Sequence, residues 1–353
     1  MKSIYLLTSL FFTTTIFAQQ TEEPRLYAAF KTTETITIDG KPDENAWKSP
    51  TWSTDFIDIE GDKTPKYKTN VKIIWDDTDL YFYAKLEEPH IWATLKQRDT
   101  VIFYNNDFEI FIDPDGDTQN YMEFEMNALN TVWDLLLPKT YREQGNAIDS
   151  WNINGLQSAV HVEGSLNDSS DKDKYWAVEI AMPWSVLTEV APGGKVPKNE
   201  FWRINFSRVN WDFDLRNGEY SRKTGKNGQF LPEYNWVWSP QGVINMHEPE
   251  HWGYVYFADV PPDVKINVRI PQDEKIRWEF YGLYRAQKTY FEKHKKWAKS
   301  LENLQKTPIL IDGKPLKAKL EMHSAGWNII AESPFSDKTY LINQEGDFKE
   351  LNK

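Results

Sequence analysis

The sequence contains no cysteine, which excludes disulfides, thiol nucleophiles and cysteine-ligated metal sites within this chain. A lipid anchor on an N-terminal cysteine is excluded for the same reason. Basic residues are outnumbered, with 41 lysines and arginines against 53 aspartates and glutamates, and the formal net charge is −12. Nucleic acid and anionic membrane surfaces are therefore not expected as partners, since both require basic patches.

Long hydrophobic runs are also scarce. The run from Ile4 to Phe17 follows the basic Lys2 and ends at Ala18, before a polar stretch. This pattern predicts a secretory signal peptide over residues 1–18, cleaved after Ala18. A membrane anchor is disfavoured because the run is short and contains threonines. We therefore expect a secreted mature protein, periplasmic or on the cell surface, without a membrane span.

Aromatic residues are abundant, with 16 tryptophans, 17 tyrosines and 19 phenylalanines. Helical periodicity is nearly absent before residue 260, where short apolar or alternating runs are separated by Gly, Pro, Asn and Asp. The predicted strands are Val71–Trp75, Leu80–Leu86, Phe108–Asp113, Tyr121–Asn127, Thr131–Leu137, Ala159–Glu163, Tyr175–Met182, Phe201–Val209 and Gly253–Phe257. This pattern predicts a mainly β protein, in which residues 19–260 form an antiparallel β-sandwich of immunoglobulin-like or jelly-roll-like type.

The character of the chain changes after Pro261-Pro262. Residues 261–306 are predicted to form a linker and one long amphipathic helix from Gln272 to about Lys306, with Leu283 and Trp297 in an apolar stripe that repeats every seven residues. We expect this stripe to pack on the sandwich or on a protein partner. Residues 307–353 contain short strand-like runs and are predicted to form a small β-rich tail.

The segment Asn106–Leu136 is the most informative part of the sequence. Within it, Tyr121, Glu123 and Glu125 alternate with apolar residues, so one face of the predicted sheet carries carboxylates and an aromatic ring. An acidic, aromatic face suits polyhydroxylated ligands and hard cations. The turn between the first two strands places Asp113, Asp115 and Asp117 two residues apart, which indicates either a structural calcium site or an ordinary acidic hairpin turn.

This segment belongs to a longer series of motifs that resembles the family 9 carbohydrate-binding modules and their family 9-like relatives. The series spans roughly residues 34 to 258. Its pieces are Ile38-Asp39-Gly40 with Trp47, Ile74-Trp75-Asp76-Asp77, the 106–113 strand, residues 175–184, residues 202–208 and Trp238-Ser239-Pro240. The resemblance implies a β-sandwich that binds saccharides and holds structural calcium.

Members of this family hold a terminal sugar between two tryptophans, with Arg, Glu and Asn side chains on its hydroxyls. The resemblance assigns the Glu to Glu109 and the Asn to Asn127, whereas Glu125 stands where sugar-binding members have the Arg. The tryptophan positions fall near Phe103 and Tyr104 and near Met246 and His247, so the clamp is altered on both sides. The residues that supply a different platform in this interpretation are Trp92, Arg98, Trp211 and Trp238.

The preferred hypothesis is a secreted, non-catalytic carbohydrate-binding protein that takes part in glycan recognition or carbohydrate catabolism. A glycoside hydrolase, or an accessory subunit of a polysaccharide-degrading enzyme, is the alternative, because Glu109, Glu123 and Glu125 lie on adjacent predicted strands. A second alternative is a haem-binding domain of the related DOMON type, with Met246 and His247 as candidate ligands. No serine-nucleophile, zinc or phosphate-loop motif is present.

Overall fold

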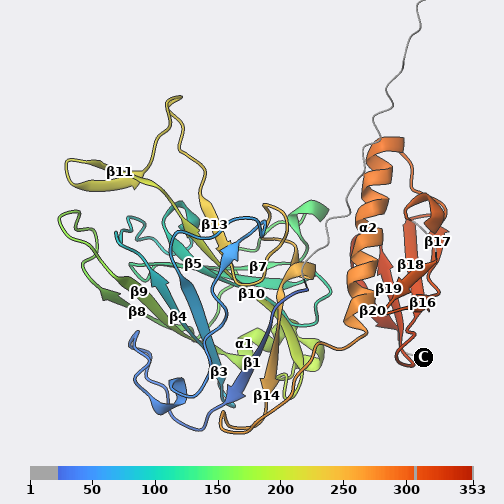
Figure 1. Ribbon diagram of the computed structural model, residues 1–353, viewed down its shortest axis with the longest axis horizontal. Coiled ribbons are helices and arrows are strands. Elements are labelled where there is room, and N and C mark those ends of the chain that lie inside the picture. The colour runs from blue at the N-terminus through green and yellow to red at the C-terminus, as the bar shows by residue number, and fades with distance from the viewer. Residues whose placement is uncertain (1–22, 306–307, 352–353) are drawn as a thin grey trace, which may run out of the picture.

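The computed structural model describes residues 23–305 and 308–351, so the predicted signal peptide lies outside the described residues. A large curled sheet and a smaller unit, formed by a helix and a second sheet, make up the molecule (Figure 1). The strands of the large sheet are β1 (Leu26–Lys31), β2 (Ile57–Asp58), β3 (Thr69–Trp75), β4 (Asp79–Glu87), β5 (Asp107–Asp113), β6 (Tyr121–Asn127), β7 (Val132–Leu137), β8 (Gln157–Glu163), β9 (Tyr175–Pro183), β10 (Phe201–Asn210), β13 (Tyr234–Val237) and β14 (Gly253–Ala258).

The strand order is β7-β6-β5-β10-β14-β1-β3-β4-β9-β8, with β13 and β2 attached beside β10. Each half of this order is antiparallel, as predicted. The two halves are joined by β1, which pairs in parallel with both β14 and β3. The alternating residues of each half point inwards and form one core, in which Phe82 of β4 meets Phe206 of β10 with ring centroids 5.7 Å apart. The predicted mainly β sandwich is confirmed.

Short elements connect or decorate the large sheet. The hairpin β11 (Phe213–Arg216) and β12 (Glu219–Arg222) extends from the end of β10. The helix α1 (Trp184–Leu187) follows β9, and short 3₁₀ turns include η1 (Asn45–Trp47), η2 (Ile102–Tyr104), η3 (Tyr141–Glu143) and η6 (Pro249–His251). The turn η2 and the hairpin stand at the edge of the sheet where β5 begins.

The predicted long helix is shorter in the structure and packs differently. The helix α2 (Glu274–His294) ends where Lys295 adopts a left-handed conformation with φ of 54°. The side chain of Gln287 is buried and bonds both the N–H and the carbonyl of Ala298, so the chain folds back after the helix. Trp297 then packs against Phe291, with ring centroids 4.3 Å apart. The seven-residue pattern therefore continues past the helix because its later members belong to the same core.

The apolar face of α2 packs on the C-terminal sheet, which corrects the expectation that it packs on the sandwich. The strands of this part are β15 (Ile309–Ile311), β16 (Lys314–Leu316), β17 (Lys319–His323), β18 (Gly326–Glu332), β19 (Thr339–Asn343) and β20 (Phe348–Leu351). Trp327 and Phe280 lie at the centre of this second core. Polar side chains of α2 reach the sandwich instead, where Arg285 bonds Glu250 at 2.6 Å and Tyr281 donates to the Asp117 carbonyl at 3.2 Å. Within the described part of the chain, no helix is long and apolar enough to cross a membrane.

Candidate functional site

A cavity of about 350 Å³ lies on the face of β5, β6, β7 and β10 that points away from the main core. The sheet places residues of this face two apart, so Glu109 and Phe111 of β5 stand beside Glu123 and Glu125 of β6. The predicted separation into an apolar and a carboxylate face is confirmed, although both faces are buried. The cavity is lined by Phe103, Glu109, Phe111, Glu123, Glu125, Trp133, Leu135, Tyr141, Val209, Glu233, Asn235, Met246 and His247, and we call it the acidic cavity.

Three carboxylates form the inner end of this site. Glu109 and Glu125 are direct partners across β5 and β6, and Asp107 lies on the same face of β5. One oxygen of each lies within 4.8 Å of the others. The Val209 N–H donates to Asp107 Oδ1 at 3.1 Å, and the Phe103 N–H donates to Glu125 Oε2 at 2.9 Å. Asp107 Oδ2 and Glu123 Oε2 are buried and have no hydrogen-bond partner among the described residues.

Burial dominates the electrostatics of the acidic cavity. It raises the pKa of Glu109 to about 7, with a further contribution from the charge of Glu233. Burial first, and then the charges of neighbouring carboxylates, raise the pKa values of Asp107, Glu123 and Glu125 well above their usual range. Without a cation, the cluster is therefore held partly in its neutral form, because several adjacent buried carboxylates cannot all ionise.

Aromatic rings form the walls. The His247 ring packs edge-on against Tyr141, with centroids 4.4 Å apart, and its Nδ1 is 3.0 Å from the Tyr121 hydroxyl. Burial lowers the pKa of His247 to about 4, so this ring is neutral at neutral pH. Trp133 lines the cavity from β7, and its Nε1–H is buried without an acceptor in the described residues. A ligand hydroxyl is the kind of acceptor that this N–H lacks.

A second group of aromatic rings stands beside the cavity. The Arg222 guanidinium of β12 lies over three rings, with 4.5 Å to the centroid of Tyr104, 4.8 Å to Trp211 and 4.1 Å to Phe230. Trp211 Nε1 donates to the carbonyl of Phe103 at 2.8 Å, which ties this group to the cavity wall. Tyr104 is 46% exposed. The predicted residues Tyr104 and Trp211 both contact Phe103, whose N–H donates to Glu125 in the acidic cavity.

Two predicted platform tryptophans are core residues instead. Trp92 is 2% exposed and stacks on Tyr220, with ring planes only 4° apart. Trp238 is also 2% exposed and lies between Tyr27 and Phe206 in the main core. Its ring leaves no room for a side chain at Gly253, where an added Cβ would come within 2.2 Å of it. Both tryptophans therefore stabilise the sandwich, and a ligand cannot reach them in this structure.

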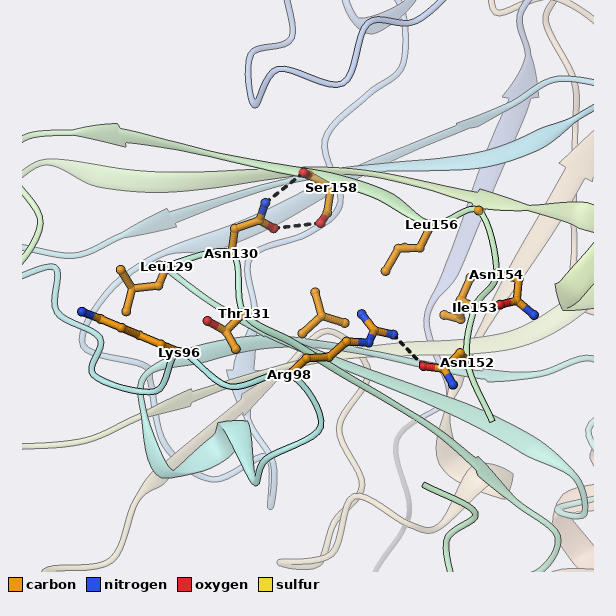
Figure 2. Close-up of a pocket in the computed structure, with 12 residues that line it drawn as sticks. Lys96, Arg98, Leu129, Asn130, Thr131, Asn152, Ile153, Asn154, Leu156 and Ser158 are labelled. Atoms are coloured by element: carbon orange, nitrogen blue, oxygen red, sulfur yellow. Dashed lines mark hydrogen bonds between the residues drawn. The ribbon is translucent and has the colours of Figure 1, made fainter. Parts of the chain in front are cut away.

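Arg98 lines a different cavity, of about 680 Å³, that Figure 2 shows, whereas Asn127 pairs directly with Asp107 across β5 and β6. Arg98 points along this cavity and donates to Asn152 Oδ1 at 3.1 Å, and its guanidinium also pairs with the buried Asp134. Asn127 is fully buried, and its Oδ1 accepts from the N–H groups of Leu129 and Thr131, so it shapes the loop that borders this cavity. The structure therefore does not bring Arg98 to the acidic cavity.

The Asp113–Asp117 turn has hydrogen bonds of its own. The buried Asp113 accepts from the N–H groups of Gly116 and Thr118 at 2.9 and 3.0 Å. Oxygens of Asp113, Asp115 and Asp117 still lie within 4.8 Å of one another, a spacing that fits calcium. Arg277 of α2 donates to the carbonyl of Gly116, which brings a positive charge to the turn. The aspartate oxygens of the turn are close enough to coordinate one ion, but the positive charge of Arg277 weakens the attraction of the turn for a cation.

Comparison with known proteins agrees with this architecture. Residues 38–211 match the family described as carbohydrate family 9 binding domain-like. This part of the chain belongs to that family. The family 9-like domain thus runs from before η1 to just past β10 and contains β2 to β10. The strands β1, β13 and β14, which complete the sheet, lie outside the match, as do Glu233, Asn235, Met246 and His247 of the acidic cavity.

Solved structures with similarity to the chain include a proposed carbohydrate-binding protein from Bacteroides uniformis, at 15% identity and a TM-score of 0.49 over 67% of this chain and 100% of that one. A family 9 carbohydrate-binding module from Caldicellulosiruptor kristjanssonii is similar in its cellotriose complex, at 14% identity, a TM-score of 0.43 and coverage of 70% and 100%. Its glucose complex is similar at 14% identity, a TM-score of 0.41 and coverage of 69% and 100%. No curated protein matches the chain.

Sequence reasoning missed several residues of the acidic cavity. Asp107 lies inside the motif that was recognised, and its position two residues before Glu109 was a usable signal. Trp133 continues the same alternation into β7, at the position opposite Glu125. Tyr141, Glu233 and Asn235 come from loops and from β13, and no periodicity connects them to the strands of the site.

Proposed function

We propose that the protein binds a saccharide in the acidic cavity without cleaving it. The observation that carries this proposal is the set of residues that meet there. The family-related positions Glu109 and Glu125, with Phe103, Met246 and His247 at the altered clamp positions, all line one cavity. Buried carboxylate oxygens accept hydrogen bonds from hydroxyls, and Trp133 and Tyr141 offer ring faces and edges to the C–H groups of a pyranose.

Saccharide titration of the purified mature protein, after a glycan array has identified candidates, tests this proposal. We expect modest affinity, in the micromolar to millimolar range, because polar groups of the site must be desolvated on binding. Trp133→Ala removes a ring contact and a buried hydrogen-bond donor, which together contribute about 1–3 kcal/mol to the free energy of binding. We therefore expect a roughly 10- to 100-fold rise in Kd. Trp52→Ala is the matched control, because Trp52 is 41% exposed and lines a different depression. Equal losses in both variants would contradict the proposed site.

Hydrolysis is the second candidate function. Glu109 and Glu125 face each other across adjacent strands, and the raised pKa of Glu109, about 7, suits a general acid. Retaining glycosidases place their two carboxyl groups about 5–5.5 Å apart, and one oxygen of Glu109 lies within 4.8 Å of one oxygen of Glu125. Release of sugar products from a glycan panel by the wild-type protein, lost in Glu109→Gln, would replace the binding proposal with an enzymatic one.

Secretion, a role in carbohydrate catabolism and a calcium ion in the Asp113–Asp117 turn complete the proposal. The pattern of residues 1–18 supports export to the periplasm or the cell surface. The spacing of the three aspartate oxygens supports calcium. A protein partner at the C-terminal unit would have to use surfaces other than the apolar face of α2, which the tail sheet covers.

A further inference from the structure

We propose that Asp107, Glu109 and Glu125 bind a divalent cation, calcium in preference to magnesium, at the inner end of the acidic cavity. We further infer that the remaining coordination positions of this ion accept hydroxyl groups of the saccharide. The second statement rests on the proposed function, whereas the first does not.

The sheet itself brings the three carboxylates together. Glu109 and Glu125 are opposite each other on β5 and β6, and like charges in such cross-strand positions destabilise a sheet. Asp107 adds a third carboxylate on the same face, and all three side chains are at most 5% exposed. A sheet that keeps this arrangement in its interior requires a positive charge or bound protons to compensate it.

An unpaired oxygen points to a missing ligand. Asp107 is fully buried, and its Oδ2 has no hydrogen-bond partner among the residues that the structure describes. Leaving a buried acceptor unsatisfied costs about 1–3 kcal/mol, more when it is charged. The Asp113–Asp117 turn differs here, because both oxygens of its buried Asp113 accept backbone N–H groups. Asp107 Oδ2 is therefore available to coordinate an ion, whereas both oxygens of Asp113 already accept hydrogen bonds.

Protein cations do not fill this role. Neither lysine nor arginine is among the described residues that line the cavity. The Arg208 guanidinium is nearby, but it is paired with Glu88 at 2.9 Å and bonds Thr69 at 3.1 Å. His247 is 4.0 Å from Glu123 and is buried as a neutral ring. Arg208 acts on Asp107 only through its charge, and within the described part of the chain no lysine or arginine forms an ion pair with the three carboxylates. A bound cation would supply the positive charge that they lack.

The donor set favours calcium. One oxygen of each carboxylate lies within 4.8 Å of the others, which is close enough for all three to coordinate one ion. Magnesium requires near-ideal octahedral geometry and usually keeps several waters, whereas calcium accepts irregular sets of carboxylate oxygens. Calcium takes six to eight oxygens, so three side chains leave positions free. The cavity gives these positions access to a ligand that carries neighbouring hydroxyls.

Calorimetric titration of the full mature chain with calcium chloride, after treatment with a chelator, tests the ion site. The matched control is Asp115→Asn, which changes the exposed aspartate of the turn and leaves the cavity intact. We expect a binding event that persists in Asp115→Asn and weakens at least tenfold in Glu125→Gln and in Asp107→Asn. Magnesium should bind the same site more weakly. Two cavity variants are included so that one that fails to fold, as seen by its melting curve, does not prevent the test.

No calcium binding by the wild type at millimolar concentration would overturn the proposal, as would identical isotherms for the wild type and both cavity variants. Binding of glucosamine in place of calcium, lost in Glu125→Gln, would also overturn it, because the cluster would then serve an amine. A saccharide that binds more tightly with calcium than with chelator supports the bridging role, and equal affinity contradicts that role. Complete absence of saccharide binding contradicts the proposed function, and the calcium titration still decides the ion site.

Discussion

Replacing Glu250 with glutamine should lower the free energy of unfolding more than breaking an exposed ion pair does, because Glu250 joins the sandwich to the C-terminal unit. Glu250 is 2% exposed and lies in η6. The guanidinium of Arg142 donates hydrogen bonds to both of its carboxylate oxygens, at 2.7 and 3.0 Å. Arg285 of α2 reaches the same carboxylate at 2.6 Å. Removing one partner of a buried ion pair costs about 3–5 kcal/mol, because the remaining charge is left uncompensated. Glu248 stays beside Arg285 at 2.7 Å, so we expect a value near the lower limit, about 3 kcal/mol.

The assay is thermal melting together with urea denaturation. A loss of about 3 kcal/mol corresponds to a fall in Tm of roughly 6–12 °C for a domain of about 150–250 residues. The control is Glu350→Gln, which breaks the Lys338–Glu350 pair at 2.9 Å on the tail sheet. Both of its side chains are 47% exposed, so this loss should stay within about 0–1 kcal/mol. Equal effects of the two substitutions would refute the reasoning.

The pH dependence of this effect has a definite sign. Burial alone raises the pKa of Glu250, but the charges of Arg142 and Arg285 outweigh it and hold the pKa well below the usual 4.5. A carboxyl group with a lowered folded-state pKa contributes stability above its unfolded-state pKa and loses it as the pH falls. The difference in stability between the wild type and Glu250→Gln should therefore be full at pH 7 and should shrink below about pH 4.5.

Three further predictions concern calcium, the second core and haem. Calcium should raise the Tm, because an ion at a hundredfold excess over its Kd adds about 2.7 kcal/mol to the free energy of unfolding. Asp115→Asn should reduce this rise in Tm by the part that comes from calcium bound at the turn. The same rise in Asp115→Asn as in the wild type would rule out the turn as a calcium site. Trp327→Ala should destabilise the C-terminal unit by about 3–5 kcal/mol, because Trp327 is fully buried. Met322→Ala is the control, since Met322 is exposed. Equal losses of stability in the two variants would argue against the second core. The purified protein should be colourless, since the His247 Nδ1 is 3.0 Å from Tyr121 and its ring is buried against Tyr141; a Soret band that survives gel filtration would support the haem alternative.

Strands with strong alternation could be predicted closely from the sequence. Tyr121–Asn127 has the same bounds in the structure, and Phe108–Asp113 begins only one residue earlier. Short strands such as β13 were missed, because four residues give too little periodicity. The parallel pairing of β1 could not be predicted either, since it depends on where distant strands lie. The helix was predicted too long, because Trp297 and Leu304 keep the helical spacing while they pack from a loop on the same core.

The candidate site was predictable where it follows strands. Glu109, Glu125 and His247 were identified from the motif order and meet at the acidic cavity. The roles of Trp92 and Trp238 could not be separated from those of surface tryptophans, because tryptophan occurs both in cores and at ligand sites. Arg98 lies in the second cavity because its guanidinium pairs with Asp134. The sequence does not show that these two residues are close in space.

The most direct measurement is a crystal structure of the mature protein with the saccharide that binds it best. The account predicts a sugar in the acidic cavity, with hydroxyls within hydrogen-bond distance of Glu109 or Glu125 and a ring against Trp133 or Tyr141. A sugar bound instead in the cavity beside Arg98 and Asn152, with the acidic cavity holding only water, would contradict it.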